Sequence, residues 1–304
     1  MTLSKLFRPM LAIAAIAICC SAVASAQYKF VKINIPESLS TWALGISNKN
    51  EIVGYYETGS TDSPLYHGFW RTNGRPPVLQ YPIDDPSADG FTELTSIDSS
   101  RLVVGAYEPP GVTVYGLFLN GGSYFSYFVP GYNGTWANGI SDSGLVVGVC
   151  AGPEPYSTAW AYTSRAGYRT FVPPGAVSAG ATAANSAGEV VGWYSDGSSV
   201  HGFLRDANEN FTTLDYPGAL STYLTGISDT GVIAGYYYAD FYQGFLLQSG
   251  VYSTVNVPGQ FNVELGQINK NGWFVGSYTT RKGKQIAFFA KPTPGASVLV
   301  DSEE

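Results

Sequence analysis

One short motif recurs six times along the chain, and this repetition limits the fold more than any other feature. A typical copy reads Gly45-Ile46-Ser47, then a polar turn, then Ile52-Val53-Gly54. The glycines that end the six copies stand at positions 54, 105, 148, 192, 235 and 276, at intervals of 51, 43, 44, 43 and 41 residues. A period of about 40–50 residues is typical of β-propellers, in which each copy supplies one four-stranded blade.

The residues after each motif predict two further strands per copy. A third strand carries elements such as His67-Gly68-Phe69 and His201-Gly202-Phe203. A fourth strand ends at proline, cleanly in Tyr252 to Pro258 and less cleanly in Pro77 to Pro82. Proline cannot donate to a strand ladder, so it suits the end of an outer strand. A single four-stranded unit cannot bury both of its faces, so the copies must stack into a ring.

The sixth copy lacks its own fourth strand, because the chain becomes polar and proline-rich after Phe289. Phe30 to Pro36 has the same spacing of aromatic, apolar and proline residues as Tyr252 to Pro258. We therefore expect residues 28–36 to complete the last blade, with Val298-Leu299-Val300 as the alternative occupant. The prediction is an all-β fold, a six-bladed β-propeller of four-stranded antiparallel blades closed by an N-terminal strand.

These expectations divide the chain into a signal peptide at 1–26, a propeller at 27–290 and a C-terminal tail at 291–304. The six repeats, numbered 1 to 6 below, are expected at about 41–90, 91–134, 135–178, 179–221, 222–262, and 263–290 together with 28–36.

The N-terminal residues predict export. Lys5 and Arg8 precede an uncharged, mostly apolar stretch from Met10 to Ser21, and Ala24-Ser25-Ala26 offers small residues for cleavage. The apolar stretch is shorter than the about 20 residues that a membrane-spanning helix needs. We expect a secreted or periplasmic protein that does not insert into the membrane after cleavage.

Charge and cysteine content narrow the partners. Removal of the signal peptide leaves Cys150 as the single cysteine, so no internal disulfide is expected. The chain has 16 basic and 23 acidic residues, and loss of Lys5 and Arg8 takes its net charge from −7 to −9. An acidic surface repels phosphate backbones, so nucleic acid is not an expected partner. We expect a monomer without a cofactor.

Three of these sequence elements resemble a bacterial family. His67-Gly68-Phe69, His201-Gly202-Phe203 and the Gly-Ile-Ser-Asp-x-Gly turn from Gly226 to Gly231 are similar to the HAF family of probable extracellular repeat proteins, named for a His-Ala-Phe element. The resemblance covers about residues 28–290, although glycine replaces the middle alanine and four of the six copies lack the histidine. It implies export and propeller architecture, and it implies no reaction.

The start of each first strand supplies one residue per repeat at one end of the central axis. These residues are Trp42, Glu93, Trp136, Gly180, Tyr223 and Glu264. The position varies among aromatic, acidic and glycine residues while the rest of the repeat is regular. Aromatic rings beside carboxylates suit sugar recognition. We therefore predict Trp42, Glu93, Trp136, Tyr223 and Glu264 as ligand-binding residues, with packing between blades as the alternative role of the rings.

Catalytic and metal-binding roles rest on fewer residues. Glu93 and Glu264 are the candidates for a paired-carboxylate hydrolase, which would hold its two acids within roughly 5–10 Å. Asp84, Asp85 and Asp89 are candidates for a Ca²⁺ site, although their spacing is not that of an EF-hand loop. For both groups the alternative is ordinary solvated or turn-capping acids.

The remaining notable residues occupy equivalent positions in several repeats, which favours structural roles. His67 and His201 occupy the same position in repeats 1 and 4. Cys150 takes the place of a tyrosine in a series that reads Tyr56, Tyr107, Cys150, Tyr194, Tyr237 and Tyr278. No histidine lies near Cys150, so we expect an inert thiol rather than a nucleophile.

The function predicted from the sequence is a non-catalytic binding module for a glycan or a surface protein. The first alternative is a carbohydrate-active hydrolase or lyase with an acidic and aromatic site at the axial mouth. The second is a purely structural extracellular repeat protein.

Overall fold

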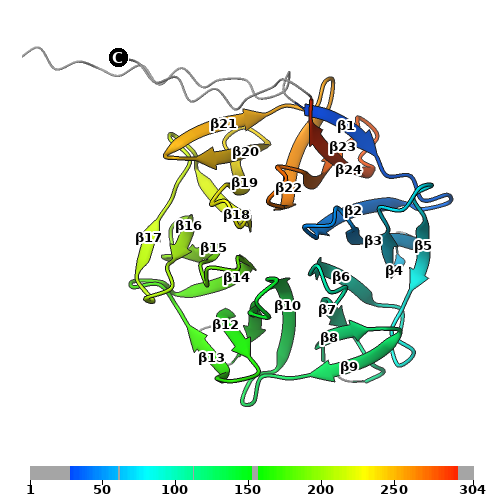
Figure 1. Ribbon diagram of the computed structural model, residues 1–304, viewed down its shortest axis with the longest axis horizontal. Helices are drawn as coiled ribbons and strands as arrows, with labels where there is room; N and C mark the ends of the chain where they lie inside the picture. The colour runs from blue at the N-terminus through cyan, green and yellow to red at the C-terminus, as the bar shows by residue number, and fades with distance from the viewer. Residues whose placement is uncertain (1–27, 61, 112, 153–156, 294–304) are drawn as a thin grey trace, which may run out of the picture.

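The computed structural model describes residues 28–60, 62–111, 113–152 and 157–293, in which all regular structure is β-strand. The predicted signal peptide, Val298-Leu299-Val300 and most of the predicted tail lie outside these residues. The strands are grouped around a central axis (Figure 1). The expected all-β, propeller-like arrangement is therefore confirmed.

Each repeat contributes strands in the predicted order. Repeat 1 contains β2 (Ser40–Ile46), β3 (Ile52–Ser60), β4 (Ser63–Arg71) and β5 (Leu79–Ile83). Repeat 2 contains β6 (Thr92–Ile97), β7 (Val103–Tyr107), β8 (Tyr115–Asn120) and β9 (Ser123–Tyr127). Repeat 3 contains β10 (Gly134–Ile140), β11 (Val146–Ala151), β12 (Ser157–Thr163) and β13 (Gly167–Phe171). Repeat 4 contains β14 (Ser178–Ala184), β15 (Val190–Ser195), β16 (Val200–Arg205) and β17 (Phe211–Thr213). Repeat 5 contains β18 (Ser221–Ile227), β19 (Ile233–Tyr238), β20 (Tyr242–Gln248) and β21 (Val251–Val255). Repeat 6 contains β22 (Phe261–Ile268), β23 (Phe274–Thr279) and β24 (Gln285–Pro292).

The hydrogen bonds divide the described strands into five sheets rather than six. Four sheets have four strands each, and repeats 4 and 5 share one eight-stranded sheet. A single parallel pair, Val200 with Ser221, joins β16 to β18. A similar isolated bridge joins Tyr66 to Phe91 between repeats 1 and 2. Neighbouring repeats therefore touch where a third strand begins beside the next first strand, and one such contact merges two units.

The strand β1 (Tyr28–Lys32) pairs with the last strand of the chain. It runs antiparallel to β24, with Tyr28 opposite Pro292 and Lys32 opposite Phe288. Beyond β1, the Ile33 amide still donates to the Ala287 carbonyl at 2.9 Å. The strand is shorter than the expected segment 28–36, whereas β24 extends past the expected boundary at residue 290 to Pro292.

The fourth strand of repeat 1 differs from the prediction. It runs from Leu79 to Ile83, so Pro82 lies inside the strand instead of ending it. The proline that matches the other repeats is Pro86, because Asp84 stands two residues before it just as Asp215 stands two residues before Pro217. The outer position of β5 tolerates the internal proline, which has no amide to donate.

The polar turn after each first strand has one capping scheme. Its first residue accepts a hydrogen bond from the amide four residues later, as in Leu102 to Asp98 at 2.8 Å and Val232 to Ser228 at 3.0 Å. Its fourth residue has a positive φ in all six repeats. Glycine fills that position in four of them, where it carries the least strain. The motif thus encodes a tight hairpin that starts every repeat.

The glycine that ends each motif leaves room for the first strand. A Cβ at Gly105 would lie 1.9 Å from the Glu93 carbonyl oxygen, and one at Gly148 would lie 2.0 Å from the Trp136 oxygen. Both distances are far shorter than any real contact. Only glycine therefore lets the second strand approach the first so closely.

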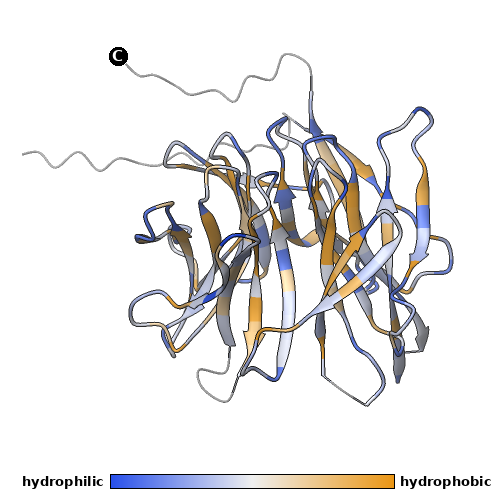
Figure 2. Cartoon of the chain, turned by 60° about the horizontal axis from the view of Figure 1, so that its bottom comes forward, coloured by the Kyte–Doolittle hydropathy of each residue, from blue (hydrophilic) through white to orange (hydrophobic). Residues whose placement is uncertain are grey.

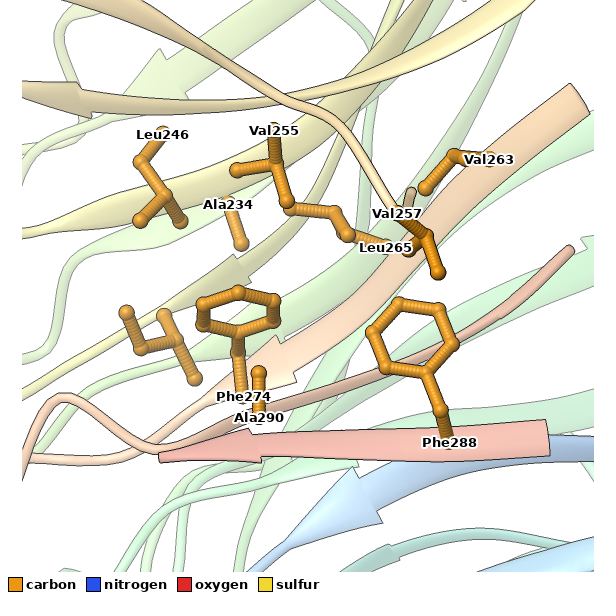
Figure 3. Close-up of a cluster of buried hydrophobic side chains, with 10 residues drawn as sticks. Ala234, Leu246, Val255, Val257, Val263, Leu265, Phe274, Phe288 and Ala290 are labelled. Carbon is orange, nitrogen blue, oxygen red and sulfur yellow. The ribbon is translucent and has the colours of Figure 1, made fainter. Parts of the chain in front are cut away.

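Apolar side chains fill the space between neighbouring repeats. Figure 3 shows one such cluster, in which Phe274 and Phe288 of repeat 6 face Leu246 and Val255 of repeat 5. Figure 2 shows apolar stretches along the strands and hydrophilic loops at their ends. The loops at the two ends of the strands thus form two separate faces around the axis.

Candidate ligand site at the axial mouth

The innermost strands, β2, β6, β10, β14, β18 and β22, surround the axis (Figure 1). Each of them starts at one face, here called the mouth, and ends at the polar turn on the opposite face, here called the floor face. Residues at the strand starts therefore lie at the mouth. The turn residues lie at the other end of the axis.

A cavity of about 260 Å³ lies on the mouth side of the axis. Its walls combine an aromatic ring from repeat 1, a tyrosine from repeat 5, a carboxylate from repeat 6 and a band of polar side chains from the strand middles. The residues that define it are Trp42, Tyr236, Glu264, Thr95, Asn138, Thr182 and Thr225. This mixture of aromatic surface and convergent polar groups is typical of a small-molecule site.

Gln267 closes the inner end of this cavity. Its amide oxygen accepts a hydrogen bond from the Ser96 hydroxyl at 2.8 Å, and its amide nitrogen donates to the Asn138 carbonyl at 3.2 Å. The side chain thus reaches from repeat 6 to repeats 2 and 3 on the other side of the axis. The mouth cavity is a blind pocket as a result.

A second set of hydrogen bonds closes the axis at the floor face. The Asn48 amide nitrogen donates to Asp142 at 2.9 Å and to Asp229 at 2.8 Å. Each carboxylate also accepts the amide of a neighbouring turn, Ser99 for Asp142 and Ser186 for Asp229. Burial raises the pKa of Asp142, but the hydrogen bonds from Ser99 and Asn48 outweigh it, so this pKa lies below its ordinary value.

Stacked ring pairs border the mouth. Trp42 stacks on Tyr55 with ring centroids 4.7 Å apart, and Tyr223 stacks on Tyr236 at 4.9 Å. In both pairs the first ring comes from a first strand and the second from the paired position of the second strand. Stacking fixes each ring in one orientation, so the aromatic surface is preorganised.

Repeat 4 reaches a similar result with a different residue. Gly180 has no side chain, and the indole of Trp193 occupies the space beside it. A Cβ added at Gly180 would lie only 2.8 Å from Trp193 Nε1. Gly180 and Trp193 are opposite each other across β14 and β15. An aromatic ring thus occupies this position of the mouth even where the first strand carries glycine.

The two predicted glutamates, Glu93 and Glu264, place ionisable carboxyl groups near the mouth. Burial raises the pKa of Glu93 to about 7 and also raises the pKa of Glu264. The pKa of Tyr55 is also raised, mainly by burial, and the charges of Glu93 and Glu264 add to this rise. Within the described residues neither carboxylate has a hydrogen bond or an ion pair. Glu264, which lines the cavity, is therefore available to accept hydrogen bonds from a ligand.

The structure separates the five predicted ligand-binding residues into two groups. Trp42 and Glu264 line the cavity. Glu93, Trp136 and Tyr223 are partly buried at their strand starts but do not line it. All six repeats line the cavity, and its aromatic and acidic walls come from repeats 1, 5 and 6.

The candidate metal ligands have other contacts. Asp84 lies 2.7 Å from His67 Nδ1 and accepts the Gly68 amide, and Asp85 accepts the Ser87 amide at 2.8 Å. Asp89 lies on the loop between β5 and β6. The described part of the chain has no cluster of three or more His, Cys, Asp or Glu residues suited to a metal ion.

The histidines and the cysteine occupy structural settings. His67 bridges Asp84 and Thr58, and His201 lies 2.8 Å from Asp215 at the equivalent place in repeat 4. Cys150 is buried, and burial raises its pKa to about 12, so it stays a protonated thiol. A thiol in that state is a poor nucleophile.

Sequence reasoning missed four mouth residues: Tyr55, Trp193, Tyr236 and Gln267. The first three directly follow the repeat glycine, one position before the series that contains Tyr56, Tyr194 and Tyr237. Because side chains alternate along a strand, the two positions face opposite sides. Gln267 was visible as the one large residue at a position that is otherwise Gly, Ser or Ala.

Four repeats expose an apolar residue at one repeated position around the mouth, in a loop or at the start of a strand. The residue three places after the loop proline is Leu39, Val177, Leu220 or Phe261, with exposed fractions of 39%, 51%, 64% and 46%. We refer to these four residues as the apolar collar.

No protein-family model matches the chain, and no curated protein matches it. Solved structures resemble it at low sequence identity. TolB from Acinetobacter baumannii is 13% identical with a TM-score of 0.54, over 81% of this chain and 65% of that one. A luciferin-regenerating enzyme is 10% identical with a TM-score of 0.53, over 88% and 96% of the two chains. An Aleuria aurantia lectin mutant in complex with Fucalpha1-6GlcNAc is 11% identical with a TM-score of 0.52, over 86% and 99%. At these identities the likeness concerns the fold alone. Within the described residues no helix is long and apolar enough to cross a membrane.

Proposed function

We propose that this chain is an exported, non-catalytic binding protein whose ligand enters the axial mouth. The observation that carries the proposal is the blind cavity of about 260 Å³ lined by Trp42, Tyr236 and Glu264. Gln267 closes it from below, so a ligand that enters contacts walls on several sides. Rings fixed by stacking add affinity at a small cost in conformational entropy.

We also propose that the fold is a six-bladed propeller in which the N-terminal strand closes the ring. Support comes from the six sequence repeats, from the single bridge that merges repeats 4 and 5, and from the pairing of β1 with β24. Export by a signal peptide at 1–26, membership of the HAF family and a monomeric state belong to the same proposal, and they rest on the sequence.

A glycan is the ligand class that the cavity fits best. Sugars present C–H faces that pack on aromatic rings and hydroxyls that donate to carboxylates. Trp42 supplies such a ring, and the Glu264 carboxylate has no partner of its own among the described residues. The same general fold holds a fucose-containing disaccharide in the Aleuria aurantia lectin mutant, which makes this use of the fold reasonable here.

A glycan screen with two matched tryptophan variants tests the proposal. The purified chain is applied to a glycan array, and each hit is measured by titration calorimetry. Trp42→Ala should weaken binding at least about tenfold, because it removes a cavity wall. Trp136→Ala should leave binding unchanged, since Trp136 occupies the same strand position but does not line the cavity. Equal losses in the two variants, or no glycan bound at all, would count against a glycan site in this cavity.

A surface protein is the second binding partner to consider. The apolar collar supports it, because four exposed apolar residues recur around the mouth. If the array gives no hit, Leu220→Ser with Phe261→Ser should reduce binding to a protein partner while leaving the fold intact. Retention of that binding in the double variant would remove the collar from the interface.

A carbohydrate-active hydrolase is the alternative that one observation favours. A carboxyl with a pKa near neutrality can act as a general acid, and the pKa of Glu93 is about 7. Glu93 does not line the cavity, however, so it is not placed to share a substrate there with Glu264. Turnover of a bound glycan that is abolished in Glu93→Gln would replace the binding proposal with this one.

A further inference from the structure

A second pocket lies on the floor face, between the first and the last repeats. Its volume is about 360 Å³. Arg71 at the end of β4 and the following loop form one side, and Trp273, Phe289 and Lys291 of repeat 6 form the other. The loop is held on this face by Asn73, whose amide donates to the Lys49 carbonyl in the turn after β2. The pocket is therefore on the opposite face from the mouth.

Three cations line this pocket without any carboxylate. They are Arg71, Arg75 and Lys291. Among the described residues none of the three forms an ion pair, whereas Arg101, Arg169 and Arg205 each have a glutamate partner. The chain has 23 acidic and 16 basic residues, so a pocket lined by three cations and no acid contrasts with its overall composition. Their mutual repulsion costs stability that an anion would relieve.

Arg71 is the most desolvated of the three. Its Nη1 nitrogen is buried and has no hydrogen-bond acceptor among the described residues. Burial lowers the pKa of its guanidinium, because water that would solvate the charge is excluded. Its charge is therefore compensated less than that of an ordinary surface arginine.

Aromatic rings hold two of the cations in place. Trp273 and Phe289 lie parallel, with their centroids 5.7 Å apart. The Arg71 guanidinium carbon is 4.6 Å from the Phe289 centroid, and Lys291 Nζ is 5.6 Å from the Trp273 ring. Cation–π contacts of this kind fix a cation without neutralising it. The pocket is thus a preorganised, positively charged site.

We propose that this pocket binds a small organic oxyanion, a carboxylate or sulfate group carried on a body about the size of one sugar ring. The three unpaired cations select the negative group, and the volume is several times that of a bare inorganic ion. This site is independent of the mouth and goes beyond the function proposed above. Because it spans repeats 1 and 6, an occupied pocket also stabilises the ring where its two ends meet.

Titration calorimetry of the purified chain at low salt tests the proposal. The probes are galacturonic acid for the carboxylate, glucose 6-sulfate for the sulfate ester, galactose as a neutral match and inorganic sulfate as a bare anion. We expect saturable binding of at least one organic anion, no binding of galactose, and affinity that falls as NaCl is added. Inorganic sulfate that binds as tightly as the organic anions would overturn the assignment to an organic ligand.

Substitutions then locate the site. Arg75→Gln with Lys291→Gln should lower affinity by about tenfold or more, since each lost cation removes a charged hydrogen-bond donor. Arg169→Gln is the matched control, because this arginine already pairs with Glu209 elsewhere on the surface. Arg75 is exposed, so Arg75→Gln alone serves if the double variant folds poorly.

The mouth variant Glu264→Gln separates this proposal from the function proposed above. It should leave anion binding unchanged, even if the mouth turns out to bind nothing. Absence of any saturable anion binding, equal affinity in the Arg75 and Lys291 variants, or loss of binding in Glu264→Gln would each refute the floor-face site.

Discussion

The repeat glycines give the sharpest quantitative test of the fold. A Cβ added at Gly105 would lie 1.9 Å from the Glu93 carbonyl oxygen, and one added at Gly276 would lie 2.5 Å from the Glu264 oxygen. Real Cβ contacts are essentially never shorter than 3.0 Å, so the strands must separate by about 1.1 Å in the first case and about 0.5 Å in the second. Overpacking of a well-packed interior costs about 1–3 kcal/mol.

We therefore expect Gly105→Ala to lower the free energy of unfolding by about 3 kcal/mol and Gly276→Ala by about 1 kcal/mol. For a chain of this size 1 kcal/mol corresponds to about 2–4 °C, so Gly105→Ala should melt about 6–12 °C below the parent chain. Urea unfolding followed by fluorescence, with calorimetric melting, measures both. Gly74→Ala is the control, because its nearest contact would be 3.2 Å and the residue is exposed.

Losses of stability in the two buried variants no larger than in Gly74→Ala would show that the repeat glycines are not needed for close strand approach. A larger loss in Gly276→Ala than in Gly105→Ala would also contradict this account, because the cost should follow the overlap. Since Glu264 lines the cavity, Gly276→Ala should also disturb ligand binding at the mouth.

Three further expectations follow from buried contacts. As pH rises from about 4.5 to 7, Glu93→Gln should gain about 3 kcal/mol of stability relative to the parent chain, because the raised pKa of Glu93 means that its ionisation destabilises the folded state. Urea titrations of both proteins at several pH values measure this difference. A difference that does not change with pH would contradict the expectation. Ile33→Ala should lower the free energy of unfolding by about 2–5 kcal/mol, because Ile33 is only 4% exposed in the apolar cluster between the first and last repeats. A loss as small as that of the exposed Lys29→Ala would show that the N-terminal segment does not stabilise the contact between these repeats. Gln267→Ala should cost about 2 kcal/mol, because it removes one buried and one partly buried hydrogen bond, whereas the exposed Gln80→Ala should cause no change. Equal melting temperatures for the two variants would argue against a bridging side chain.

The repeat made much of the fold predictable. The spacing of glycines gave the strand order within each repeat, and the spacing of Phe30 to Pro36 pointed to the segment that pairs with the last strand. The outer strand of repeat 1 was placed wrongly, because Pro77, Pro82 and Pro86 all offered a possible end. Local composition cannot choose among several prolines when pairing with β4 decides the register.

The site was less predictable than the fold. Trp42 and Glu264 were found because the start of a first strand has a fixed place in the repeat. Trp136 occupies the equivalent position in repeat 3 but does not line the cavity, because the outline of a cavity depends on how side chains from several repeats pack around the axis. Gln267 illustrates the same limit, since its partners Ser96 and Asn138 are 171 and 129 residues away in sequence.

The pairing of β1 with β24 also fixes the orientation in which the molecule can be attached to anything else. Tyr28 lies opposite Pro292, and Pro292 lies beside Gly272 in the last polar turn, so both described ends are on the floor face. A linker, tag or solid support joined next to Tyr28 or Pro292 would leave the mouth pointing away from the point of attachment. The same tether would crowd the pocket that contains Lys291. Immobilised protein should therefore report faithfully on ligands of the mouth, whereas anion binding is best measured with the molecule free in solution.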